Sequence, residues 1–244
     1  MKKIFFIQLL FFYSFCVSQT KTDAKKYFSI VKDIIYRNQK VSVLTLKLDS
    51  LTKSYPKDYR CYSNNLYNRS ITLEYKHARI NLKIDNLESQ IDILSLNDSI
   101  ILSTAKTFYF KDLKYKNHDS KKIINFLLNR NSDYNSNKKI NDIYDEISTT
   151  ETFAMHCGDG STRTDRGKLV YALVEKNNIK KLNLMLKNIN CEIQAFGVEG
   201  FKMLKEKGIA IPDEPTVLIE NIIKRNSELE ICLGCISGLI KKIY

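Results

Sequence analysis

The stretch Met155–Lys168, MHCGDGSTRTDRGK, gathers residue types that often carry out chemistry. It contains one histidine, one cysteine, three glycines, two aspartates and two arginines within fourteen residues. Further along the chain, the sequence CLGC places Cys232 and Cys235 three positions apart. Such residues can hold a metal ion or a phosphate, supply a nucleophile, or form a disulfide. Their spacing has to decide between these possibilities.

The spacing argues against a phosphate-binding loop. A Walker loop needs four residues between its first glycine and a Gly-Lys pair that Ser or Thr follows. Here six residues separate Gly160 from Gly167, and Leu169 follows Lys168. A dinucleotide-binding turn fails in the same way, because it requires glycine where Arg163 stands. We therefore expect no bound nucleotide.

Calcium binding and nucleophilic catalysis also fit poorly. A calcium loop that began at Asp159 would place Arg163 at a position for an oxygen ligand, and Val170 where a bidentate glutamate is needed. A cysteine nucleophile needs an oriented base within hydrogen-bonding reach. His156 is adjacent to Cys157 in the sequence, and neighbouring side chains usually diverge. The sequence contains no G-x-S-x-G motif.

Two alternatives that use the cysteines stay open. His156, Cys157, Cys232 and Cys235 are four side chains of the types that bind zinc, although zinc sites usually combine two separated pairs. The pair in CLGC also resembles a redox motif, but such a pair normally opens a helix after a strand. Here it follows a segment with a helical pattern and lies near the end of the chain.

A structural disulfide is the favoured interpretation. Once Cys16 is removed with the signal peptide, an odd number of cysteines remains. We expect Cys157 to pair with Cys232 or Cys235, which would close a loop of roughly 75 residues and constrain the unfolded chain by about 4 kcal/mol. In this interpretation the sequence contains no catalytic residue, no cofactor site and no metal site, and its glycines let an irregular loop bend.

The first residues predict export. Two lysines precede an apolar run from Ile4 to Val17 that is too short to cross a bilayer, so residues 1–18 are interpreted as a signal peptide cleaved before Gln19. Phe15 precedes Cys16 where a lipoprotein signal would have a small residue. We therefore expect an exported chain without a lipid anchor or a later transmembrane segment, located in the periplasm, on the cell surface or outside the cell.

The net charge of +12 is concentrated in the first half of the chain. Most of the basic residues are lysines interleaved with acids, whereas proteins that read nucleic acids rely on arginine forks. We interpret the charge as a solvated surface and expect no nucleic-acid partner. The expected partner is another envelope protein or a glycan, although the sequence identifies neither.

Helical spacing dominates the N-terminal region, residues 19–132. Apolar residues repeat at helical intervals from Tyr27 to Ile35, and a stripe from Leu66 to Leu94 predicts one long helix over residues 65–96, with His77 on its apolar seam. Residues 41–51 fit a helix or a strand. Residues 99–111 are also ambiguous, and the helix is favoured. Asp119 or Ser120 caps the next predicted helix.

The polar segment Asn129–Lys139 is the predicted domain boundary, and residues 133–244 form the C-terminal helical domain. Short connections between apolar helical segments predict antiparallel hairpins with HEAT-like or armadillo-like spacing. Gly197 and Gly200 lie on a buried stripe, where they leave room for a close neighbour, with the face of Leu218 and Ile222 as the candidate. The whole chain is thus predicted to be mainly α, with an α+β N-terminal region as the alternative.

The signal peptide, CGDG, EIQAFGVEGFKML and CLGC together resemble a family of exported Bacteroidota proteins with a C-terminal helical domain. The resemblance covers about residues 150–240. It implies the cell envelope or exterior and brings no activity or functional residues with it. Together with the expected disulfide, it favours a non-catalytic helical module that binds or scaffolds another envelope component. The alternative is a redox or zinc protein that uses Cys157, Cys232 and Cys235.

Overall fold

The computed structural model describes residues 22–55, 61–72, 74–85 and 87–244. The predicted signal peptide, residues 1–18, lies outside the described residues. Within them, no helix combines the length and the apolar character needed to cross a membrane.

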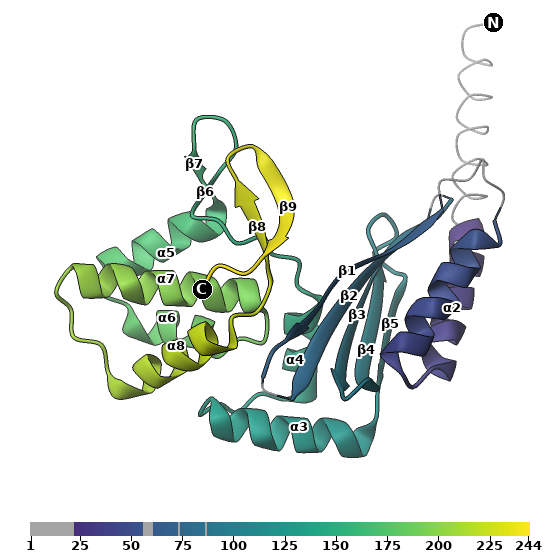
Figure 1. Cartoon of the computed structure of the whole chain (residues 1–244), viewed down its shortest axis with the longest axis horizontal. Coiled ribbons are helices and arrows are strands. Elements are labelled where there is room, and N and C mark those ends of the chain that lie inside the picture. The colour runs from purple at the N-terminus through teal and green to yellow at the C-terminus, as the bar shows by residue number, and fades with distance from the viewer. Residues whose placement is uncertain (1–21, 56–60, 73, 86) are drawn as a thin grey trace, which may run out of the picture.

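A five-stranded antiparallel sheet forms the centre of the first half of the chain (Figure 1). Consecutive strands are neighbours, in the order β1 (Tyr62–Ser70), β2 (Tyr75–Ile84), β3 (Leu87–Leu96), β4 (Ser99–Thr107) and β5 (Lys114–His118). The turn between β3 and β4 places Asn97 and Asp98 at positive φ, as a tight hairpin of this type requires.

The prediction of a mainly α chain is wrong. Strands β1 to β4 occupy most of residues 65–96, which were predicted as one long helix, and of residues 99–111, where a helix was favoured. The long helix over residues 65–96 does not exist. Residues 99–107, for which a helix was favoured, form β4. The physical reason is that both faces of the sheet are covered, so that nearly every residue of β3 is buried. Apolar residues then recur at intervals that also fit a helix.

Two helices cover one face of the sheet with apolar side chains. A helix over residues 22–37 and α2 (Val41–Lys53) pack on alternate residues of β2, including Ala78, Ile80 and Leu82. Residues 41–51, which fitted either structure, are therefore helical. Asp98 accepts hydrogen bonds from the Ser42 backbone nitrogen (2.9 Å) and hydroxyl (2.6 Å), which fixes the start of α2 against the β3–β4 turn.

The opposite face of the sheet is covered by α3 (Ser120–Asp133), α4 (Ile140–Ser148) and parts of the C-terminal half. Asp119 caps α3, as predicted, by accepting from the backbone nitrogens of Lys121 and Lys122. The polar segment Asn129–Lys139 includes the end of α3 and the connection to α4, and both helices contact β4.

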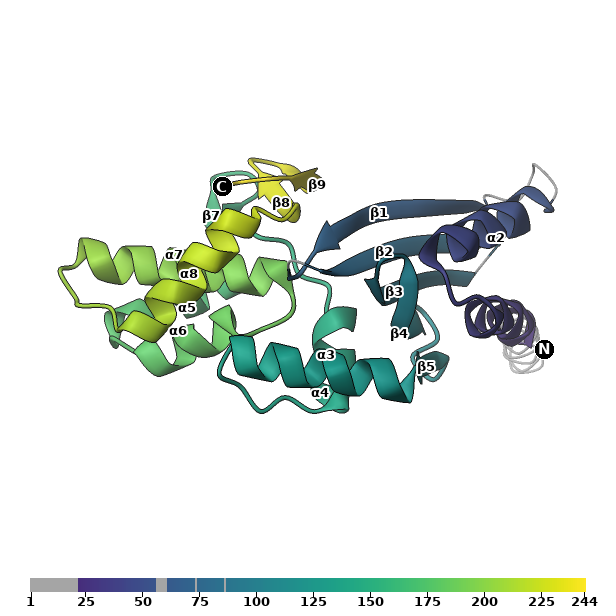
Figure 2. The same cartoon turned by 60° about the horizontal axis from the view of Figure 1, so that its bottom comes forward.

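Four helices form the second half of the molecule, which we call the helical lobe: α5 (Asp165–Glu175), α6 (Ile179–Leu186), α7 (Cys191–Glu206) and α8 (Asp213–Arg225). Thr164 caps α5 by accepting from the Gly167 nitrogen (2.9 Å). The long helix α7 packs against α5 and α6, and α8 packs on α6, with its ribbon passing in front of α7 in Figure 2. The described residues from 22 to 148, which form the sheet and the helices that cover it, are called the sheet lobe.

The two buried glycines of α7 face α6, and not α8 as predicted. A side-chain carbon at Gly197 would lie within 3.1 Å of Leu186 and Met185 atoms, and one at Gly200 would lie 2.5 Å from a Leu182 methyl group. At these distances an added methyl group fits only if the neighbouring leucine side chains move.

Gly200→Ala is therefore expected to lower the free energy of unfolding by about 1 to 3 kcal/mol, the usual range for overpacking a core. Alanine is the better helix former by roughly 1 kcal/mol, so a merely local effect would stabilise the protein instead. Urea unfolding distinguishes the two signs. An increase in stability would show that α6 and α7 are less closely packed than the structure has them.

Two short hairpins lie beside each other at the edge of the helical lobe (Figure 1). The first joins β6 (His156–Cys157) to β7 (Thr162–Arg163), and the second joins β8 (Leu229–Leu233) to β9 (Ile236–Lys241). The segment CLGC therefore forms the end of β8 and the following turn. It does not open a helix.

Candidate functional site

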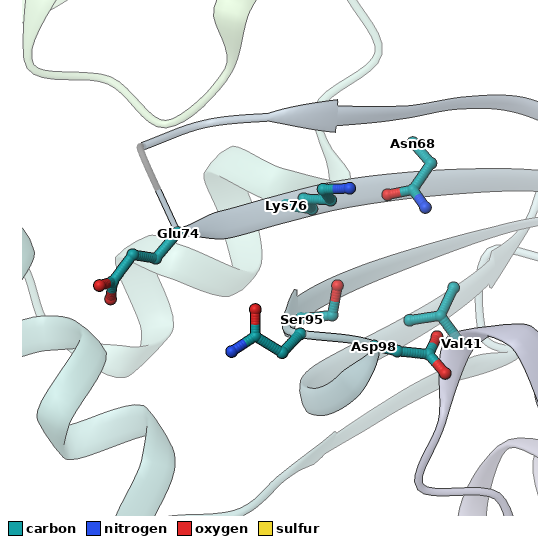
Figure 3. A pocket seen from close by; sticks show the side chains of 7 residues that line it. Val41, Asn68, Glu74, Lys76, Ser95 and Asp98 are labelled. Atoms are coloured by element: carbon teal, nitrogen blue, oxygen red, sulfur yellow. The ribbon is translucent and has the colours of Figure 1, made fainter.

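A pocket of about 220 Å³ lies between residues of the sheet and the start of α2 (Figure 3). Seven residues line it, namely Val41, Asn68, Glu74, Lys76, Ser95, Asn97 and Asp98. They come from β1, from β2 and the residue before it, from the start of α2, from the end of β3 and from the β3–β4 turn. None of the seven is a histidine or a cysteine.

The charged groups of this pocket do not form an acid–base pair. The hydrogen bonds from Ser42 lower the pKa of Asp98, because they stabilise its carboxylate. Asp98 is thus committed to the start of α2. The other acid, Glu74, immediately precedes β2, and the base, Lys76, is the second residue of that strand. We therefore assign the pocket no chemistry.

The cysteines of the two hairpins lie together. Cys157 and Cys232 form a disulfide, with a Cα–Cα distance of 5.8 Å and a sequence separation of 75. Of the two pairings that the sequence left open, the structure has this one. Cys61 and Cys191 are free thiols, half-buried and buried respectively.

Cys235 is an exposed free thiol in the turn of the β8–β9 hairpin, three residues after the disulfide-bonded Cys232. Its sulphur donates a hydrogen bond to Asp159 Oδ1 (2.6 Å), and the neighbouring Gly234 carbonyl accepts from the Gly158 nitrogen (2.7 Å). The hydrogen bond to the Asp159 carboxylate raises the pKa of Cys235, because it favours the protonated thiol.

The proposed zinc ligands are not arranged as a metal site. Cys157 and Cys232 are joined to each other, and His156 packs edge-on against the ring of Tyr171, with centroids 6.0 Å apart. Among the described residues, no group of three or more His, Cys, Asp or Glu side chains could hold a metal ion. A disulfide sulphur is not a thiolate and is a poor zinc ligand.

A buried ion pair joins the sheet to the helical lobe. The guanidinium of Arg69, on β1, binds both carboxylate oxygens of Glu192 in the first turn of α7, with Nη2 and Oε2 2.7 Å apart. Arg69 also donates to the Glu228 carbonyl (2.9 Å), and Glu192 accepts from the Glu230 nitrogen (2.8 Å). Both side chains are almost completely buried.

A second buried network lies beside it on the same face of the sheet. Asp92 on β3 accepts from Arg79 Nε (2.6 Å), from Gln90 Nε2 (2.5 Å) and from His77 Nε2 (2.9 Å). Arg79 also donates to the carbonyls of Ile147 (3.0 Å) and of Thr149 (2.9 Å) at the end of α4. These contacts use buried charge to hold α4 on the sheet.

His77 is buried and electrically neutral at neutral pH. Burial lowers its pKa to about 4, which outweighs the opposing effect of its hydrogen bond to Asp92. Arg79 already neutralises Asp92, so a proton on the imidazole would leave the network with a net positive charge. Because the carboxylate can only accept, the neutral ring carries its hydrogen on Nε2.

Stability is expected to fall between pH 6.5 and pH 4. In this window the unfolded chain protonates His77 and the folded chain does not, so unfolding takes up a proton and becomes easier as the pH falls. The pKa difference corresponds to a loss of up to about 3 kcal/mol, fully restored above pH 6.5. Urea unfolding at pH 4.5, 5.5, 6.5 and 7.5 measures the free energy of unfolding in this window, and the variant His77→Gln is the comparison.

In His77→Gln, the glutamine amide can still donate to Asp92 but does not titrate. The free energy of unfolding of this variant should therefore depend less on pH between pH 4 and pH 6.5. The carboxylates Asp92 and Glu192 have lowered pKa values, caused by their arginine partners against the opposing effect of burial. Their contribution is lost as the pH falls below the ordinary carboxyl pKa values of 4.5 and 3.8, at the acid end of this window. If His77→Gln showed the same pH dependence of stability as the unmodified chain, His77 would not be its cause.

Arg225, at the end of α8, makes a third set of contacts at the junction. It donates to the Ile71 carbonyl (2.6 Å), to Gln194 Oε1 (2.6 Å) and to the Tyr134 hydroxyl (3.2 Å). One arginine thus connects the end of β1, the end of α3 and α7. The junction is fixed by several independent contacts.

Exposed aromatic side chains gather at one end of the sheet. Tyr62, Phe108 and Tyr109 are 43%, 44% and 72% exposed. Glu88 holds two of them, because its carboxylate accepts from the Tyr62 hydroxyl (3.2 Å) and its carbonyl from the Phe108 nitrogen (3.1 Å). Partial burial and Glu88 raise the pKa of Tyr62, and nearby Tyr109 adds to this effect. These four residues are called the aromatic surface.

Sequence reasoning missed the two buried networks and the aromatic surface. The alternating pattern of β2 could have indicated one of the networks. Ala78, Ile80 and Leu82 occupy every second position, so His77 and Arg79 must lie together on the opposite face of the sheet. The partners of Arg69 and Tyr62 are far away in the sequence. No local pattern indicates them.

No protein-family model, no curated protein and no solved structure matches the chain. The resemblance to exported Bacteroidota proteins therefore stays a prediction.

Proposed function

We propose that the chain is an exported, non-catalytic binding or scaffold module of the cell envelope. Its partner is another envelope protein or a glycan, and it contacts this partner through the aromatic surface. The proposal rests on the position of the buried charged side chains. Arg69, Glu192, Arg79 and Asp92 lie inside the body of the protein, between the sheet and the elements packed on it. There they bind one another and backbone carbonyls, so that they hold the body together and do not face a substrate.

The disulfide supports the location. Disulfides persist in oxidising compartments such as the periplasm or the exterior, and a cytoplasmic chain of this kind would keep its thiols reduced. The disulfide between Cys157 and Cys232 and the short apolar run at the start of the sequence support export independently of each other.

The aromatic surface supports a binding role. Tyrosine and phenylalanine combine a large apolar face with few rotatable bonds, and tyrosine in particular is over-represented among the residues that dominate binding energy. Their hydrogen bonds to Glu88 restrain two of the three residues before any partner arrives. A preformed surface loses less conformational entropy on binding.

Substitution of the aromatic residues tests the proposal. The mature chain is immobilised, and binding is measured to envelope extract and to a panel of envelope polysaccharides. Phe108→Ala and Tyr109→Ala should each weaken binding by roughly 30-fold, as loss of a contact worth about 2 kcal/mol does. Leu184→Ala is the matched control, because Leu184 is 59% exposed on α6, in the helical lobe.

The extract and the polysaccharide panel separate the two kinds of partner. Binding by the unmodified chain and by Leu184→Ala, together with loss in both aromatic variants, is the expected result. Equal binding by the unmodified chain and all three variants would show that the aromatic surface does not contact the partner. Turnover of any component of the extract by the mature chain would contradict a non-catalytic role.

A further inference from the structure

The three cysteines of the two hairpins combine a disulfide with an unpaired thiol. Cys235 is exposed, whereas Cys232, three residues earlier, is only 7% exposed. Two contacts place Cys235 against the residues that follow Cys157. These are the hydrogen bond from Cys235 Sγ to Asp159 Oδ1 and the backbone bond from Gly158 to Gly234.

We propose that Cys157, Cys232 and Cys235 form a thiol–disulfide exchange centre with two disulfide isomers, one that presents Cys235 to solvent and one that keeps Cys232 as a buried thiol. In the exchange, Cys235 gives its proton to solvent and its thiolate attacks Cys157 Sγ. The Cys157–Cys232 bond breaks, the Cys157–Cys235 bond forms, and Cys232 leaves as a thiolate that takes up a proton. No oxidant or reductant is consumed.

The two isomers are balanced in the energy of loop closure. The first closes a loop with a sequence separation of 75, and the second lengthens it by only three residues. Loop-closure entropy depends on the logarithm of loop length, so it does not distinguish them. The β6–β7 and β8–β9 hairpins remain joined in both isomers.

Burial and backbone geometry also permit the second isomer. A free cysteine is most often buried and behaves as a small apolar residue, which suits the position of Cys232 on β8. The residues that must move belong to two tight turns, in which Gly158, Gly160 and Gly234 have positive φ. The strands β6 and β7 contain only two residues each, so few backbone bonds resist the movement.

Asp159 controls the rate of exchange. Its hydrogen bond stabilises the protonated thiol, and only the thiolate attacks a disulfide. Exchange is therefore slow at low pH and accelerates about tenfold per pH unit while Cys235 is mainly protonated. The isomers differ in what they offer to the outside. The thiol of Cys235 can form a mixed disulfide with an external disulfide, and the buried thiol of Cys232 is shielded.

Disulfide mapping of the mature, oxidised chain tests the proposal, which does not depend on the binding function. The protein is incubated without added thiol at pH 5 or pH 8.5, quenched with acid, labelled with N-ethylmaleimide in denaturant, and digested without reduction. At pH 5 the map should contain Cys157–Cys232 and labelled Cys235. At pH 8.5 peptides that contain Cys157–Cys235 and labelled Cys232 should appear with time. A map with only Cys157–Cys232 at both pH values would overturn the proposal.

Two variants sharpen the test. Asp159→Asn should accelerate the appearance of Cys157–Cys235 at a given pH, whereas Asp165→Asn, an exposed aspartate in the first turn of α5, should not. Cys232→Ser, refolded with reduced and oxidised glutathione, should join Cys157 to Cys235. Two free thiols in this folded variant would count against the proposal. If Cys232→Ser does not fold, the time course of the unmodified chain decides alone.

Discussion

Glu192→Gln is expected to lower the free energy of unfolding by about 3 to 5 kcal/mol, the usual cost of removing one partner of a buried ion pair. Arg69 would keep its charge inside the protein without a carboxylate to balance it. Glu192 also accepts from the Glu230 nitrogen, so its replacement weakens the contact between α7 and β8 as well. The change is large compared with the stability of a typical domain, about 5 to 15 kcal/mol.

Urea unfolding of the oxidised protein at pH 7.5 measures this loss. The matched control is Glu199→Gln on the same helix, where Glu199 and Lys202 form a partly exposed pair with 3.9 Å between the charged atoms. This control should change stability by less than about 1 kcal/mol.

The double variant Arg69→Met with Glu192→Leu should recover much of the loss, because it leaves no uncompensated charge. If Glu192→Gln is as stable as Glu199→Gln, the ion pair does not join the lobes. If the double variant loses as much as the single one, the loss arises from packing and not from charge.

Cys157→Ser is expected to lower the free energy of unfolding by about 4 kcal/mol, the loop-entropy value for a closed loop of 75 residues. It removes both disulfide isomers, since Cys157 is common to them. Dithiothreitol should lower the stability of the unmodified chain to that of the variant and should have no further effect on the variant.

Cys61→Ser is the control for this change, because Cys61 is a free, half-buried thiol. It should change stability by less than about 1 kcal/mol. Equal stability of the unmodified chain with and without dithiothreitol would show that the disulfide constrains nothing. Cys232→Ser should lose less than Cys157→Ser, because Cys235 can take its place.

Helix ends were predictable because their signals are local. Asp119 caps α3, as predicted, and Thr164 caps α5 through the same kind of local hydrogen bond. Gly208 has positive φ directly after α7, which is the usual role of a glycine at the C-terminal end of a helix. These side chains and glycines bind or bend the backbone within a few residues, so the sequence alone contains the information.

The sheet was not predictable from periodicity because polar side chains occupy its buried face. Arg79, His77 and Asp92 lie between the apolar residues of β2 and β3 and are themselves buried. The strands therefore lack the exposed polar face that makes a strand recognisable. The predicted segments 65–96 and 99–111 leave Asn97 and Asp98 between them. The pair was not interpreted as a hairpin turn, although both residues favour the positive φ of a tight hairpin.

The candidate site was predictable only in part. The sequence indicated that Cys157 and the two cysteines of CLGC belong together, and it left their pairing open. The partner of Arg69, Glu192, lies 123 residues away, and an isolated arginine carries no sign of its partner. Close packing at Gly197 and Gly200 was recognised from their position on a buried stripe, but the neighbouring helix depends on the tertiary arrangement and was assigned wrongly.

Native-state hydrogen exchange tests most directly whether the buried charges join the two lobes into one cooperative body. We predict that the slowest amides of β3 and of α7 exchange through the same opening, with one free energy equal to that of global unfolding, and that Glu192→Gln lowers both by the same amount. Amides of α7 that open at a free energy several kcal/mol below those of β3 in the unmodified chain would contradict this account, because the helical lobe would then unfold on its own.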